Sequence, residues 1–189
     1  MLLCTDIKQN THIYNHYFKG FAAMIKSQII ILQQAQTYLA SVTEAQYTEV
    51  IEPFFMSSAG AHIRHILDHY FSIINGFKKG LIDYDKRSRG GVIENSPQAA
   101  QEAIVEIVTF LNSLSIHELQ QIVKLSTEIS VADKQVAVVD TTLAREIVFA
   151  GSHTVHHLAT IKHIAQMQNV NVDKDLGIAP ATATFLRVG

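Results

Sequence analysis

Four long segments with apolar residues at helical spacing constrain the fold of this 189-residue chain more than any other feature. They span residues 17–40, 58–79, 96–114 and 141–169. In each segment the apolar residues recur every three or four positions, which places them along one face of a helix. Four long helices most simply bury such faces against one another. The sequence therefore predicts an all-α fold, a four-helix bundle.

Helix-capping residues support these boundaries. Ser96 followed by Pro97 is typical of a helix start, because serine caps free N–H groups and proline is tolerated in the first turn. Asp140 or Thr141 is the expected cap of the last long helix. Shorter patterns of the capping-box type predict single helical turns, at residues 43–46 and 115–118.

The remaining segments differ in their patterns. Residues 80–95 carry charges and paired glycines without periodicity, which is typical of a crossing loop. Residues 122–140 alternate Val, Ile and Thr with polar residues, which favours a small β-hairpin between the third and fourth long helices. The tail after Val170 lacks periodicity, and we expect it to lie over the bundle.

Composition indicates one folded domain and excludes several partners. With 48% hydrophobic and 17% charged residues the chain can bury a sizeable core, so we expect a single domain over residues 1–189. A net charge of −2 offers no attraction for nucleic acid or for an anionic membrane. No apolar run reaches the ~18–20 residues that span a bilayer.

The single cysteine and the N-terminal residues indicate the cellular compartment of the protein. Cys4 cannot form a disulfide within the chain, and the N-terminus lacks the basic and long apolar stretches of a signal peptide. We therefore expect a cytoplasmic protein. Because no basic neighbour or capped helix start surrounds Cys4, we do not expect it to be a nucleophile.

Seven of the ten histidines fall within two of the predicted long helices. These are His62, His65 and His69 in the second helix, and His153, His156, His157 and His163 in the fourth. Histidines three or four positions apart share a helix face, so two such helices could supply three imidazole nitrogens to one point. Three nitrogens that leave a position open for water or substrate are typical of catalytic zinc, and they also suit nickel, iron or manganese. The clusters predict a divalent metal site, in preference to a hydrogen-bonded histidine core.

Helical-wheel geometry separates the histidines of the fourth helix. At ~100° per residue, His157 and His153 lie about 40° and 80° from the apolar stripe. His156 and His163 lie about 140° and 160° from it. The first pair is therefore expected to face inward, and the second pair needs no role beyond the surface.

The same geometry is less decisive for the second helix. It places His62 and His69 about 80–100° from the apolar stripe and His65 about 140° from it. Periodicity alone therefore favours His62 or His69 as the ligand from this helix.

Two motifs resemble the DinB/YfiT-like family. Residues 57–69 read Ser-Ser-Ala-Gly-Ala-His-Ile-Arg-His-Ile-Leu-Asp-His and resemble its second helix, and residues 152–157 read Ser-His-Thr-Val-His-His and resemble the HxxHH segment of its fourth. The match extends to residues 83–85 and 142–146. The family looks like a metal-binding four-helix bundle with one ligand from helix two and an HxxxH pair from helix four.

Carried over by motif, the resemblance implies His65, His153 and His157 as metal ligands. His62, His69 and Asp68 are the alternatives, either as ligands or as supports of a ligand. The basic residue or glutamine that usually follows the HH pair is absent, because Leu158-Ala159-Thr160 stands there.

The resemblance also implies a type of enzymatic activity. Members look like thiol-dependent enzymes, so the expected activity is that of a metalloenzyme, S-transferase-like or hydrolase-like, acting on a small molecule. Its ion would lower the pKa of a bound low-molecular-weight thiol or water. Asp68 or Glu146 could orient an imidazole or accept a proton, although an exposed helix-face carboxylate is the commoner explanation of either. Arg87 and Arg89 could pair with a substrate carboxylate, or only solubilise their loop.

Two other functions compete with this one. A non-catalytic metal or small-ligand binding module, or a stress-associated protein, would use the same histidines. A bundle without a metal would hold them by hydrogen bonds. A homodimer through an exposed helix face is also expected, although no heptad repeat specifies it.

Overall fold

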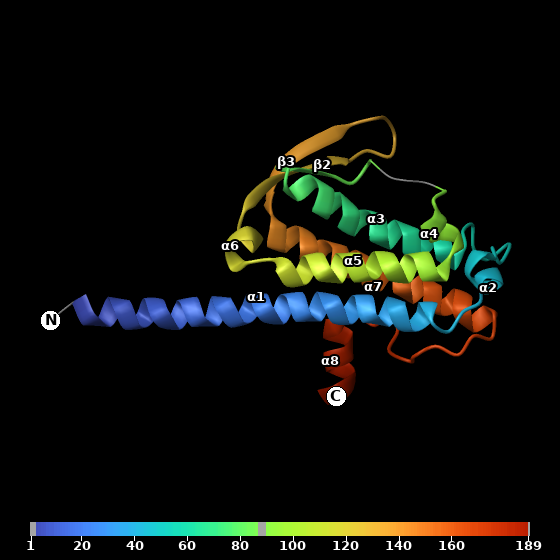
Figure 1. Cartoon of the computed structure of the whole chain (residues 1–189), viewed down its shortest axis with the longest axis horizontal. Coiled ribbons are helices and arrows are strands. Elements are labelled where there is room, and N and C mark those ends of the chain that lie inside the picture. Colours follow the sequence, from blue (N-terminus) through green and yellow to red (C-terminus); the bar gives the residue numbers. More distant parts are fainter. Residues whose placement is uncertain (1–2, 87–89, 189) are drawn as a thin grey trace.

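The computed structural model describes residues 3–86 and 90–188, and over that part of the chain it contains eight helices and three strands. The long helices are α1 (Leu3–Leu39), α3 (Ala59–Phe77), α5 (Pro97–Ser113) and α7 (Leu143–Met167). Helix α1 packs on α5 and α7, and α3 packs on the same two helices (Figure 1). The four shorter helices are α2 (Glu44–Thr48), α4 (Val92–Asn95), α6 (Ile116–Leu119) and α8 (Pro180–Val188). The expectation of a mostly helical protein is confirmed.

The core lies where the four long helices face one another. Each contributes fully buried apolar side chains, such as Leu32 of α1, Ile66 of α3, Ile107 of α5 and Leu158 of α7. Burying one such side chain stabilises a fold by about 1.5–3 kcal/mol. The apolar stripes of the sequence therefore determine which helix faces meet.

The helix starts follow the predicted caps, with one correction. Ser96 caps α5, whose first residue is Pro97, as predicted. Both short capping boxes are present, at the starts of α2 and α6. The predicted cap of the last long helix was wrong, since Thr142 caps α7 through its hydroxyl. The two earlier candidates, Asp140 and Thr141, lie earlier in strand β3, so neither is next to Leu143, the first residue of α7.

The predicted hairpin is confirmed, and it belongs to a sheet of three strands. Strand β2 (Ile122–Glu128) pairs antiparallel with β3 (Val136–Thr142). Strand β1 (Leu81–Asp83) pairs parallel with β2. Both β1 and α4 lie within residues 80–95, so the expectation of a crossing loop there was wrong for these two elements. Three residues are too few for a periodic pattern, and β1 is held by its pairing and by the buried Ile82.

Both ends of the chain differ from expectation. Helix α1 begins at Leu3 instead of near residue 17, and its N-terminal part extends past the other helices (Figure 1). The tail packs on the long helices through the buried Val170 and Leu176, as expected. The tail then forms α8, which the sequence did not predict. Helix α8 has no buried residue, and it projects away from the four long helices (Figure 1). None of the described helices is long and apolar enough to cross a membrane.

Candidate metal centre

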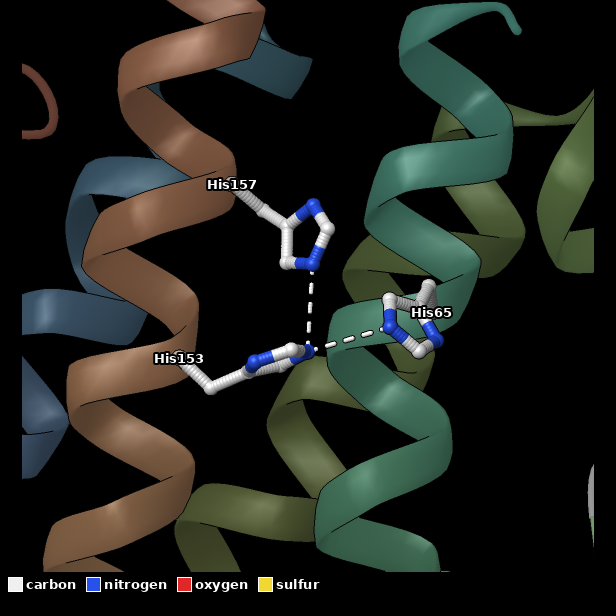
Figure 2. Close-up of side chains that lie close together, drawn as sticks. All are labelled: His65, His153 and His157. Carbon is white, nitrogen blue, oxygen red and sulfur yellow. Dashed lines mark hydrogen bonds between the residues drawn. The ribbon is translucent and has the colours of Figure 1, made fainter. Parts of the chain in front are cut away.

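Three imidazoles from two helices converge between α3 and α7 (Figure 2). Nε2 of His153 lies 3.1 Å from Nε2 of His65 and 3.1 Å from Nε2 of His157. One ring nitrogen from each of the three lies within 4.8 Å of the others. The structure therefore brings to one point one histidine of α3 and two histidines one turn apart on α7.

The position of the cluster follows from how the two helices pack. Ile63 and Ile66, on either side of His65 along α3, are fully buried, whereas His65 is only half-buried. His153 and His157 are also half-buried. The cluster thus lies at the margin of the core instead of on its central stripe. This position explains why helical-wheel geometry favoured His62 or His69 over His65, although His65 is the α3 histidine of the cluster.

The spacing of the nitrogens suits a shared cation. Imidazole nitrogens bind Zn²⁺ at about 2.0–2.1 Å, so two of them on one ion lie about 2.8–3.4 Å apart for bond angles of about 90–110°. The separations of the His153 nitrogen from the nitrogens of His65 and His157, each 3.1 Å, fall in that range. The three histidines can therefore hold a metal ion, and their chemistry suits zinc or a similar divalent cation.

His62 lies on the far side of His157. Its Nδ1 is 2.9 Å from Nδ1 of His157, and its Nε2 is 3.2 Å from the hydroxyl of Ser57. The other nitrogen of His157 is the one that faces His153. His62 therefore contacts the outer edge of the His157 ring and not the point where the three Nε2 atoms meet.

His69 is buried beneath the cluster. Its Nδ1 donates a hydrogen bond of 2.9 Å to the backbone carbonyl of His65, which fixes its proton on that nitrogen. Its ring stacks on Tyr84, with the ring centres 4.9 Å apart, and lies 4.0 Å from the ring of His153. His69 thus separates the cluster from the polar groups around Tyr84.

Glu146 is fully buried, so its interpretation as an exposed carboxylate was wrong. Its Oε2 accepts a hydrogen bond of 2.7 Å from the Tyr84 hydroxyl. Its Oε1 accepts from Thr141 at 2.7 Å and from Arg145 at 3.1 Å. Burial, and next the contact with Glu146, raise the pKa of Tyr84 well above its ordinary value. The hydrogen-bond donors to this carboxylate are therefore Tyr84, Thr141 and Arg145, and none of them is an imidazole. Its spacing from Leu143 and Ala150 on the inward face of the helix could have revealed this.

The other predicted site residues have different surroundings. Asp68 accepts a hydrogen bond of 2.7 Å from Arg64, which also donates to Glu94 at 2.7 Å. His156 and His163 are exposed, as the wheel predicted. Arg87 and Arg89, the candidates for substrate binding, lie outside the described residues.

Burial favours the neutral forms of His157 and of its neighbour His62. Desolvation, and next the neighbouring His153 and His65, lower the pKa of His157 from 6.5 to about 3. Desolvation also lowers the pKa of His62. A neutral imidazole keeps a lone pair for a cation, so these rings are in the form that binds metal at neutral pH.

The fold and the histidine cluster together define a mostly helical protein with a site that is compatible with metal binding. Solved structures share this fold. A DinB-like protein of Bacillus subtilis, YjoA, superposes with a TM-score of 0.59 and 15% identity, covering 82% of this chain and 98% of that one. A DinB-like protein of Bacillus cereus gives a TM-score of 0.51 and 14% identity, covering 82% and 95%. The chain therefore has the DinB-like fold that its motifs predicted.

Sequence comparison gives a narrower match. FK506-binding protein 5 of Rhizopus delemar is 30% identical over 107 residues, which cover 57% of this chain and 28% of that protein. The chain thus spans less than a third of the length of this curated relative. No protein-family model matches the sequence.

Proposed function

We propose that this chain binds one divalent metal ion through His65, His153 and His157. The observation that supports the proposal is the meeting of three Nε2 atoms from α3 and α7, with separations of 3.1 Å between His153 and each of the other two. Three protein ligands leave coordination positions for water or for a substrate, which is typical of catalytic sites. The DinB-like fold is consistent with this role.

The proposed activity is that of a small-molecule enzyme, S-transferase-like or hydrolase-like. When bound, the ion would lower the pKa of a thiol or a water and so supply a nucleophile at neutral pH. Neutral imidazole ligands would bind the ion without reducing its positive charge. We further propose that Asp68, three positions after His65 on the same helix, orients that ligand.

The domain organisation, the location and the oligomeric state of the protein are part of the same proposal. We infer one DinB-like domain over residues 1–189, built on α1, α3, α5 and α7 as a four-helix bundle. A cytoplasmic location suits an activity that uses a low-molecular-weight thiol. We also propose that the protein forms a homodimer through an exposed helix face.

Metal analysis of protein purified without a histidine tag tests the ligand set. We expect about one ion per chain in the wild type and in His163→Ala, and little in His153→Ala. Stoichiometric metal in His153→Ala would refute the ligand set. For the activity, zinc-loaded wild type and His153→Ala are compared in the conjugation of glutathione to an aryl halide. Equal rates in the two proteins would refute catalysis of this reaction at the site.

A non-catalytic binding module is the second candidate, and the position of His69 favours it. Its ring lies 4.0 Å from that of His153, so a small shift could make it a fourth ligand and close the site. His69→Phe distinguishes the two functions. Loss of metal in this variant favours a closed site, whereas full retention favours an open one.

A further inference from the structure

His62 and His157 meet through their Nδ1 atoms, which are 2.9 Å apart. Nε2 of His157 faces His153 at 3.1 Å, and Figure 2 shows the other nitrogen of this ring pointing away from both His153 and His65. The two nitrogens of His157 therefore have different neighbours. One belongs to the cluster and the other belongs to His62.

The position of the protons follows from this arrangement. A hydrogen bond between two imidazole nitrogens needs a proton on one and a lone pair on the other. If Nε2 of His157 gives its lone pair to a metal ion, its proton must be on Nδ1, and Nδ1 of His62 must accept it. The proton of His62 is then on Nε2, which lies 3.2 Å from the Ser57 hydroxyl and donates to its oxygen.

We propose that His62 is a positioning residue, which fixes the tautomer and the ring orientation of His157 for metal binding, and that Ser57 in turn fixes His62. This inference rests on the proposed metal site. It assigns His62 a place outside the ligand set, because Nδ1 of His62 contacts the nitrogen of His157 that points away from the cluster.

The choice of an imidazole for this position has a chemical consequence. A carboxylate that accepts from a ligand histidine makes that histidine a stronger donor and adds a negative charge beside the ion. His62 orients the ring as a neutral acceptor. The ion therefore keeps more of its charge for a bound water or thiol than it would beside a carboxylate.

Zinc affinity tests the inference. His62→Phe keeps a ring of similar size but removes the acceptor, and His62→Asn restores an acceptor atom close to the position of Nδ1. We expect His62→Phe to bind zinc about 10- to 100-fold more weakly than the wild type, while still taking up one ion per chain at saturation. We expect His62→Asn to recover most of the affinity. His156→Phe, a change on the exposed neighbour of His157, should leave the affinity unchanged.

A spectroscopic readout separates positioning from general packing. Long-range ¹⁵N–¹H correlation spectra of zinc-loaded wild type should show His157 protonated on Nδ1 and His62 on Nε2. Wild-type affinity in His62→Phe, equal losses in the Phe and Asn variants, or the opposite tautomer of His62 would each overturn the inference. If His62→Phe does not fold, Ser57→Ala replaces it, with an expected several-fold loss of affinity, and an unchanged affinity would count as refutation.

The outcomes also separate this inference from the proposed function. If wild-type protein binds no zinc, the metal site itself fails. If the wild type binds zinc, His153→Ala does not, and His62→Phe equals the wild type, only the role of His62 is refuted.

Discussion

The hydroxyl of Tyr84 donates a hydrogen bond of 2.7 Å to the fully buried carboxylate of Glu146. This contact joins the residue that follows strand β1 to the first turns of α7. The ring of the same tyrosine stacks on His69, so it connects the sheet to the histidine cluster. Both residues are buried, and the contact is therefore protected from water.

Tyr84→Phe should destabilise the protein, because it leaves one oxygen of a buried carboxylate without its donor. A hydrogen bond to a charged group contributes about 1.5–3 kcal/mol. Tyr47→Phe is the matched control, since the Tyr47 hydroxyl donates to the neutral backbone carbonyl of Ile93 at 2.8 Å. Removing that bond should cost only about 0.5–1.5 kcal/mol. Urea unfolding measures both, and equal losses would contradict the special role of Glu146.

Gly60→Ala should also destabilise the protein. A Cβ at this position would meet the backbone oxygen of Glu94 and would lie 2.9 Å from a ring carbon of Tyr47. Helix α4 therefore passes directly over the first turn of α3, two residues before His62. Overpacking of this kind costs about 1–3 kcal/mol.

Gly20→Ala is the opposite case on α1. Apart from its chain neighbours and the surrounding backbone of α1, no atom of the described residues lies within 4 Å of a Cβ built there. Because alanine is the better helix former, this change should stabilise the protein by up to about 1 kcal/mol. A similar effect of the two glycine substitutions on thermal unfolding would contradict the close contact at Gly60.

Stability of the metal-free protein should depend on pH through His157. The pKa of this residue is lowered to about 3 in the folded chain, while the unfolded chain takes up a proton near 6.5. The unfolded state therefore binds more protons between these values, and the free energy of unfolding should fall as the pH drops from 7 toward 4.

Replacement of His157 checks the source of this dependence. His157→Phe removes the group, so its unfolding free energy should change less over the same pH range. His163→Ala, which changes an exposed histidine of the same helix, should keep the wild-type slope. Identical slopes in all three proteins would show that His157 does not cause the pH dependence.

Much of the fold could be predicted because it depends on local signals. The caps at Ser96 and in the short turns act through hydrogen bonds to residues three positions away, so their patterns are visible in the sequence. Strand β1 could not be predicted, since its pairing partner β2 lies about 40 residues later in the chain. The cap at Thr142 was missed for a related reason, because the end of β3 decides where α7 can begin.

Only part of the candidate metal site could be predicted from the sequence. The spacing of His153 and His157 placed both on one face of α7, and they do lie together. Periodicity could not select among the histidines of α3, because the cluster lies at the margin of the core. The contacts of His62 with Ser57 and His157, and of Tyr84 with Glu146, join distant parts of the chain or depend on ring orientation. Only the packed structure shows these contacts.

X-ray absorption spectroscopy of zinc-loaded protein tests the central claim most directly, because it identifies the atoms bound to the ion. We predict three imidazole nitrogens at about 2.0–2.1 Å in the wild type and in His163→Ala. We predict loss of this imidazole shell in the triple variant His65→Ala, His153→Ala, His157→Ala. A zinc shell without imidazole in the wild type, or the same shell in the triple variant, would contradict the account.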